Sequence, residues 1–260
     1  MKRIFLILSM AIFVFYLVEG KISKNDFKFE NEYLEYHAFW GFINLGSIKI
    51  WTKTDGEYVK SRFQMDSNPW LFFISIHYGF ESEFKVDSLL DSKFLIYETK
   101  KGRKVVTIFE RKDDKIIATQ KDIKTGEVIE VLEKNTRSFY NGIAAFYLTR
   151  QLLGTGQEVT IPILIQLDVK DVKVTFPTEN ANIKFSNLNV KVKKVVGFIP
   201  FITEEIAGVT GDFIAYYSDD PAKIPIRAYF KTSLGNVKVE LVKWDRKNWE
   251  PSWIADKNKN

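Results

Sequence analysis

Two histidines, His37 and His77, are the side chains whose type best suits metal binding or general-base work near neutral pH. His37 lies in the run Tyr36-His37-Ala38-Phe39, and His77 lies between Ile76 and Tyr78. Neither has an acidic or second histidine neighbour at the spacing that zinc ligands take on a helix or in a hairpin. We therefore interpret both as packed or surface histidines, and no metal site is predicted.

Paired carboxylates are the next candidates for chemistry, because glycoside hydrolysis needs two converging acids. The chain has three adjacent pairs: Asp113-Asp114, Glu204-Glu205 and Asp219-Asp220. Neighbouring residues of a strand point to opposite faces, so an adjacent pair in a strand does not converge. The first pair falls between two strand-like runs and the third precedes Pro221, which favours turn formation for both.

Other catalytic signatures are missing from the sequence. There is no Gly-x-Ser-x-Gly elbow, and the glycine pairs lack the lysine and serine or threonine of a phosphate loop. Cysteine is absent, which excludes a disulfide framework, a thiolate nucleophile and a lipidated cysteine. The sequence therefore predicts a protein that is not an enzyme and that needs no cofactor.

Aromatic residues are unusually abundant, with 22 Phe, 11 Tyr and 6 Trp, more than one buried face of a small sheet needs. Two of the densest clusters span residues 70–76 and 198–202. The excess either enlarges the core of a large sheet or lines an apolar binding surface or protein interface. For the second case the predicted rim consists of Trp70, Phe72, Phe73, Phe198 and Phe201.

The elements that would position these residues are many short strands with turn signals about every ten residues, as in an antiparallel sheet or barrel. Residues 139–153 carry the main predicted helix, capped by Ser138 or Asn141 and closed by Gly154. Residues 67–76 are either a helix or a buried strand. The run from Gly197 to Ile202 contains a proline, which predicts a loop or short helix.

Residues 1–20 have the basic start, apolar run and small final residue of a secretory signal peptide. We expect cleavage near Gly20 and a periplasmic protein; the alternative is an uncleaved N-terminal membrane anchor. Residues 21–30 are expected to be flexible, 31–247 to form a single β-rich domain and 248–260 to form a tail. The formal charge of +5 is spread among acidic residues, so no nucleic-acid partner is predicted, although proximity to anionic lipid is compatible with it.

One stretch resembles a known family: Tyr217-Ser218-Asp219-Asp220-Pro221, followed by Pro225, Arg227 and the turn Gly235-Asn236. It is similar to the C-terminal signature of the DUF3108 family of exported bacterial proteins. Residues 36–50, with Gly41 and Gly46 at a turn, resemble the opening strand pair of that family, and 144–156, with Tyr147 and Arg150, resemble its central helix. Arg137-Ser138 stands where the family often has an aspartate, which leaves a partner for Arg150 open.

The resemblance implies a mainly β fold, a large curved antiparallel sheet forming a half-barrel or open barrel with one main helix, in the style of envelope lipoprotein carriers. It implies no activity. From the residues themselves, Ser218, Asp219, Asp220 and Pro225 shape a turn and a strand start, and a buried Arg227 paired with either aspartate would specify the fold. We expect a non-enzymatic binder of a lipid or other amphiphile. A module that docks on an envelope protein is the alternative, and a hydrolase of envelope polymer is a third interpretation.

Overall fold

The computed structural model describes residues 28–71, 75–100, 102–203, 208–232, 235–247 and 249–250. The predicted leader, Phe72 and Phe73 of the predicted rim, the pair Glu204-Glu205 and the last ten residues lie outside these ranges. Within them, no helix is long and apolar enough to cross a bilayer.

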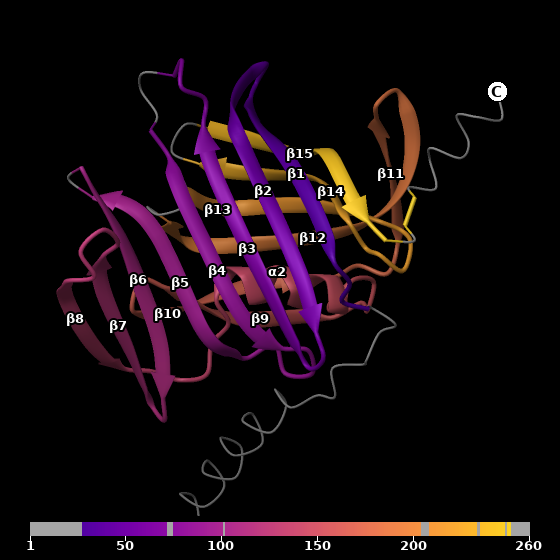
Figure 1. The fold of residues 1–260 in the computed structure, drawn as a ribbon. Helices are drawn as coiled ribbons and strands as arrows, with labels where there is room; N and C mark the ends of the chain where they lie inside the picture. Colours follow the sequence, from indigo (N-terminus) through magenta and orange to yellow (C-terminus); the bar gives the residue numbers. More distant parts are fainter. Residues whose placement is uncertain are drawn as a thin grey trace, which may run out of the picture.

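Strands dominate the described part of the chain, as the turn spacing predicts (Figure 1). The elements are β1 (Glu32–Trp40), β2 (Ile43–Asp55), β3 (Tyr58–Ser67), β4 (His77–Lys85), β5 (Asp91–Lys100), β6 (Arg103–Lys112), β7 (Lys115–Asp122), β8 (Val128–Asn135), α2 (Gly142–Leu152), β9 (Glu158–Ile165), β10 (Asp168–Thr175), β11 (Asn180–Phe185), β12 (Leu188–Thr203), β13 (Val209–Ser218), β14 (Pro225–Thr232) and β15 (Gly235–Arg246).

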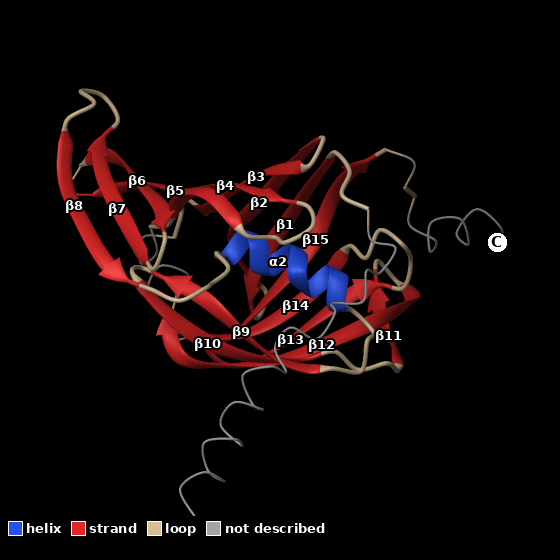
Figure 2. Ribbon diagram, turned by 90° about the horizontal axis from the view of Figure 1, so that it is seen from below, coloured by secondary structure: helices blue, strands red, loops and turns tan. Residues whose placement is uncertain are grey.

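All of these strands belong to one antiparallel sheet of 15 strands, ordered β8-β7-β6-β5-β4-β3-β2-β1-β15-β14-β13-β12-β10-β9, with β11 paired to β12 off this path. The first strand pairs with the last, so β1 and β15 lie side by side in the middle of the strand order. The sheet curls round on itself but β8 and β9 remain its two edges (Figure 2). The predicted large curved antiparallel sheet, open at one seam, is confirmed.

Several hairpins of the sheet are closed by short turns built from residues that tolerate positive φ. Gly56, Gly102 and Gly126 have φ of 58°, 78° and 74°, and Asp113 of the β6–β7 turn has φ of 53°. Asp113-Asp114 therefore forms a hairpin turn, and the pair is not a catalytic dyad in a strand.

Helix α2 confirms the predicted helix, and Asn141 is its N-cap. The Asn141 side-chain oxygen accepts hydrogen bonds from the backbone N–H groups of Ile143 (2.8 Å) and Ala144 (2.9 Å). Gly154, with φ of 75°, ends the helix because an ordinary side chain is disfavoured in that conformation.

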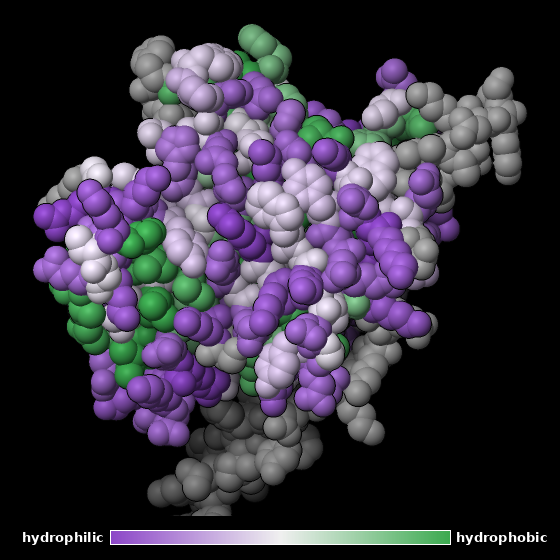
Figure 3. Space-filling model, viewed as in Figure 1, coloured by the Kyte–Doolittle hydropathy of each residue, from purple (hydrophilic) through white to green (hydrophobic). Residues whose placement is uncertain are grey.

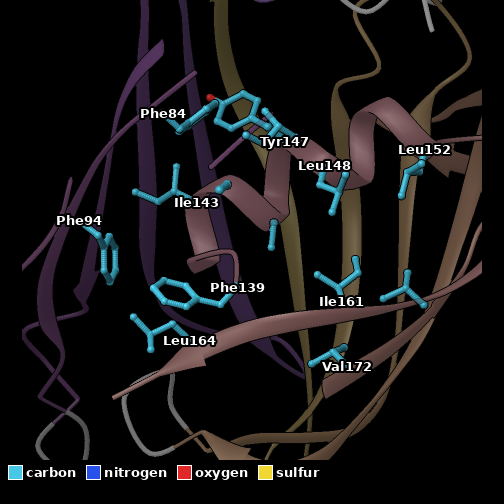
Figure 4. Close-up of a cluster of buried hydrophobic side chains, with 14 of the residues drawn as sticks. Phe84, Phe94, Phe139, Ile143, Tyr147, Leu148, Leu152, Ile161, Leu164 and Val172 are labelled. Atoms are coloured by element: carbon cyan, nitrogen blue, oxygen red, sulfur yellow. The ribbon is translucent and has the colours of Figure 1, made fainter. Parts of the chain in front are cut away.

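The helix lies on the concave side of the sheet and forms the centre of the core (Figures 2 and 4). Tyr147 and Ile143 point towards Phe84 of β4, while Leu148 and Leu152 face Ile161 and neighbouring strands of the opposite wall. Burying each such side chain is worth roughly 1.5–3 kcal/mol. The helix therefore ties the two walls of the curled sheet together.

The prediction of a loop or short helix at 197–202 is wrong, because these residues belong to the long strand β12. Pro200 falls beyond Phe198, where pairing with β10 ends, and inside the gap in the β12–β13 register between Ile199 and Thr203. A proline is tolerated where no ladder hydrogen bond is required of its nitrogen. Residues 68–71 lie in the loop that follows β3. They form neither the helix nor the buried strand that the sequence suggested for 67–76.

Candidate ligand-binding site

The concave face of the sheet is only partly filled by α2, and a cavity remains on its inner surface beyond the helix. This cavity has a volume of about 440 Å³ and lies against the inner face of β4–β8 and the β9–β10 turn. Fourteen residues line it: Tyr78, Phe80, Ile96, Glu98, Lys100, Thr107, Phe109, Ala118, Gln120, Glu130, Leu132, Gln166, Leu167 and Asp168.

Strand register arranges the lining in rows across the strands. The deeper row places Phe109 beside Ala118, and Ala118 beside Leu132. The next row runs from Phe80 and Ile96 through Thr107 to Gln120 and Glu130. Because each row is two residues further along every strand, the lining changes from apolar to polar along the strand direction.

The polar end of the cavity is held by pairs of side chains. Lys100 and Glu98 on β5 form an ion pair at 2.8 Å, and Gln120 donates a hydrogen bond to Thr107 at 3.3 Å. At the other end of the cavity, beyond the apolar row, Lys134 of β8 pairs across the seam with Asp168 at the start of β10, and this hydrogen bond and charge lower the pKa of Asp168. Glu98, Lys100, Gln120 and Glu130 thus make one end of the cavity polar.

A larger hollow of about 1100 Å³ lies on the opposite, outer face of the sheet over β1–β5. The rings of Trp51 and Tyr33 lie there in a tilted arrangement, 5.5 Å between centroids, with Arg62 over Trp51. The charged residues that line this hollow include two ion pairs, Lys60–Glu83 (3.2 Å) and Arg62–Glu81 (3.7 Å). This surface is open and charged, and we regard the inner cavity as the better candidate for a ligand.

The three described residues of the predicted apolar rim, Trp70, Phe198 and Phe201, do not line the cavity. Trp70 is 63% exposed in the β3–β4 loop, and Phe198 is 46% exposed on β12. Phe201 lies on β12 and packs against the main core. Phe72 and Phe73 lie outside the described residues, so the structure is silent about them.

The two histidines have single polar neighbours. The Nδ1 atom of His37 lies 3.4 Å from the Asn44 amide nitrogen, and that of His77 lies 3.1 Å from the Asp66 carboxylate. Asp66 is directly opposite His77 in the β3–β4 pairing, so the expectation that His77 has no acidic neighbour at hairpin spacing is wrong. Among the described residues no three His, Asp or Glu side chains converge as a metal-binding group.

The structural signature residues 218–225 form a turn that is tied to the helix. Asp220 accepts hydrogen bonds from the N–H groups of Ala222 (2.9 Å) and Lys223 (3.1 Å), and Ser218 accepts one from Ile224 (2.8 Å). The carbonyl of Pro225 accepts from the Tyr36 hydroxyl at 3.0 Å. Asp219 pairs with Lys191 at 3.0 Å. These residues fix the start of β14.

Arg227 pairs with Glu240 of the adjacent β15 and donates to the carbonyl of Lys184. The partner considered from the sequence, Asp219 or Asp220, is therefore incorrect. Arg227 and Glu240 are directly opposite in the β14–β15 register, which brings their side chains to the same face.

Arg150 occupies the centre of a buried ionic cluster. Its guanidinium donates to Glu32 (2.5 and 3.1 Å) and to the carbonyl of Ala222 (2.8 Å), and Arg246 donates to the same carboxylate at 2.8 Å. Burial raises the pKa of Glu32, but attraction and hydrogen bonds from Arg150 and then Arg246 outweigh burial, so the pKa lies below its ordinary value.

Sequence reasoning missed Glu32 and the whole cavity lining. A signal for Glu32 did exist, since Glu32, Leu34 and Tyr36 alternate on one strand and the latter two are buried. A carboxylate in phase with core residues indicates a buried charge that needs a cationic partner. The cavity lining has no comparable local signal, because its residues come from strands joined only in the folded sheet.

Comparison with known proteins gives a family and a fold. No curated protein matches the chain. The chain is similar to a solved structure described as a β-barrel-like protein of a domain of unknown function, DUF1849, from Brucella abortus, with 10% identity, a TM-score of 0.52, and 85% of this chain and 100% of the other covered. That likeness supports the fold alone. The sequence profile of DUF3108, a family of proteins of unknown function, matches residues 35–242, and the chain belongs to that family.

Proposed function

We propose that this protein binds a lipid or other amphiphile, without catalysis, in the cavity on the concave face of its sheet. One observation carries the proposal: the cavity lining passes from Phe109, Ala118 and Leu132 to Glu98 and the other polar residues along the strands. An acyl chain would lie against the apolar rows, and its headgroup would meet the polar end.

The size of the cavity is compatible with this ligand class. Its volume of about 440 Å³ lies within the range of small-molecule sites, roughly 300–1,000 Å³. Each methylene removed from water contributes about 0.8 kcal/mol, so about ten buried methylenes would gain roughly 8 kcal/mol before the costs of immobilisation. A single-chain amphiphile fits better than a two-chain phospholipid.

Export belongs to the same proposal and rests on the leader-like sequence of residues 1–20. We place the protein in the periplasm, where a carrier or sensor of amphiphiles would meet membrane lipids.

The test is binding of a dansyl-labelled fatty acid to the wild-type protein and to two variants of β8. Leu132 lines the cavity and is 43% exposed, and Val131 is 57% exposed on the opposite face of the same strand. Leu132→Glu places a charge against the acyl chain and is expected to weaken binding at least tenfold, which corresponds to about 1.4 kcal/mol. Val131→Glu adds the same charge outside the cavity and is expected to bind like the wild type.

Two results would overturn the proposal. The wild-type protein could fail to bind the probe, which removes the ligand class. Equal binding by both variants would place the ligand elsewhere.

A second candidate function, docking on a protein partner, is favoured by the apolar outer surface of the β5–β8 region (Figure 3). Ile129 and Val131 are 43% and 57% exposed there, on a strand with a free edge. Crosslinking in cells from position 129, which is two residues from Val131 on the same face of β8, tests this function. Loss of a crosslinked partner in Val131→Glu with unchanged fatty-acid binding would support docking.

A further inference from the structure

The two ends of the sheet differ in the residues that their turns carry. Antiparallel pairing places the β1–β2 turn, the β3–β4 loop, the β5–β6 and β7–β8 turns and the end of β12 at one end, which we call the tip end. The β2–β3, β4–β5, β6–β7 and β13–β14 connections lie at the opposite end.

The tip end exposes large apolar side chains. Phe42, at the tip of the β1–β2 turn, is 95% exposed, Trp70 of the β3–β4 loop is 63% exposed, and Ile202 near the end of β12 is 64% exposed. Trp40 and Ile123 are also exposed at this end. Of the described connections at the opposite end, only β4–β5 exposes a large apolar side chain, Leu90. Large apolar side chains exposed on several turns at one end indicate an interaction surface.

The charge differs between the ends as well. Three basic residues, Lys100, Arg103 and Lys104, flank the β5–β6 turn, and Lys121 and Lys124 flank the β7–β8 turn. The acidic residues near them are Glu98, which pairs with Lys100, Asp122, which accepts from the N–H groups of its own turn, and Glu127. The turns of the opposite end carry charges of both signs: Asp55, Glu57, Asp87, Asp113, Asp114 and Asp219, with Lys85, Lys112, Lys115 and Lys223 beside them.

Apolar turn tips beside lysine and arginine suit an anionic bilayer, because the tips enter the headgroup and acyl boundary while the cations meet lipid phosphates. We infer that the tip end docks on an anionic phospholipid surface, with Phe42 and Trp70 inserted and the basic β5–β6 and β7–β8 turns against the headgroups. The inference goes beyond ligand binding and does not require it. The polar end of the cavity, at Glu98 and Lys100, lies towards the same end.

The test is flotation with vesicles of phosphatidylcholine containing one quarter phosphatidylglycerol, using the protein in the form in which it accumulates in cells. The wild type and all variants have the same N-terminal segment, so any vesicle binding by that segment is the same in every sample. Phe42→Ser with Trp70→Ser is expected to lower vesicle binding at least tenfold, and Leu90→Ser at the opposite end is its control.

Charge is tested with a matched pair on β6. Lys104 lies at the tip end and Lys112 at the opposite end, an even number of residues apart and therefore on the same face of the strand. One cation near an anionic surface contributes about fivefold in binding, so Lys104→Glu should weaken binding at least fivefold. Lys112→Glu should stay within about twofold of the wild type, and pure phosphatidylcholine should bind weakly.

Three outcomes would overturn the inference: no binding of the wild type to anionic vesicles, equal losses from Lys104→Glu and Lys112→Glu, or recruitment of a protein through Phe42 and Trp70 without vesicle binding. The fatty-acid proposal fails separately. Leu132→Glu should keep vesicle binding, and the Phe42 and Trp70 double variant should keep fatty-acid binding in solution.

Discussion

Among single residues, Glu32 is the buried carboxylate with the largest expected effect on stability. It joins β1 to helix α2 through Arg150 and to β15 through Arg246. Both Glu32 and Arg150 are buried, so neither charge has water as an alternative partner. The cluster also contacts the Ala222 carbonyl, which connects the signature turn to the helix.

Removing the carboxylate should therefore be costly. Glu32→Gln leaves two buried guanidinium groups without their anion, and the free energy of unfolding should fall by about 3–5 kcal/mol in urea denaturation. Glu35→Gln on the same strand is the control, since Glu35 is half-buried and accepts a hydrogen bond from Tyr33 at 2.7 Å. A change below about 1 kcal/mol for Glu32→Gln would show that the cluster does not support the fold.

The same residue predicts the response to acid. Because the pKa of Glu32 is lower in the folded state, the unfolded chain binds more protons as the pH falls, and stability decreases. The contribution is complete above the unfolded pKa, about 4.3, and is lost as the pH falls through the folded pKa. Urea denaturation between about pH 3 and pH 7 should give a steeper loss for the wild type than for Glu32→Gln. Parallel curves would contradict this assignment.

At the scale of elements, helix α2 depends on Asn141 for its start and for its contact with the sheet. Asn141 caps the helix and donates through its amide nitrogen to the Ser82 hydroxyl of β4 at 2.9 Å. One side chain thus satisfies the first turn of the helix and fixes its distance from the wall of the sheet.

Asn141→Ala removes both functions and should lower the free energy of unfolding by about 2–3 kcal/mol, the cap contributing about 1 kcal/mol. Asn141→Ser keeps an uncharged cap acceptor and loses the amide donor to Ser82, so its loss should be smaller. Thermal or urea denaturation measures both. If the two substitutions destabilise the protein equally, the cap is not what positions the helix.

At the scale of the whole molecule, the open seam between β8 and β9 sets both ligand access and local stability. All eight residues of β8 are exposed, and β8 pairs with β7 on one side only. The centre of the sheet differs, since β1 pairs with both β15 and β2 and buries Leu34 and Tyr36.

Native-state hydrogen exchange should reveal this gradient. Amides of β8 that bond to β7 are expected to exchange through local opening, at a free energy several kcal/mol below that of amides in β1. A saturating amphiphile should slow exchange in β8, because Leu132 and Glu130 line the cavity. Equal protection of β8 and β1 in the free protein would mean that the seam is covered in solution.

The sequence by itself determined the antiparallel β class, the turns, the helix around 139–153 and the family resemblance. Each of these depends on local patterns: alternation of apolar residues, glycine and aspartate in turns, and a cap residue before an apolar helix. The prediction from the sequence was wrong at 197–202. Proline is disfavoured in a strand where its nitrogen would have to donate a ladder hydrogen bond, but Pro200 lies in a part of β12 where neither β10 nor β13 pairs with it.

Only the tertiary structure decided the partner of Arg150, the cavity lining and the difference between the two ends of the sheet. Glu32 lies 118 residues from Arg150, and the cavity is lined from five successive strands and a distant turn. The register and curvature of the sheet bring such residues together, and those depend on the summed packing of all strands. Local sequence carries the period of each strand, whereas the neighbours of a side chain across the sheet are properties of the assembled fold.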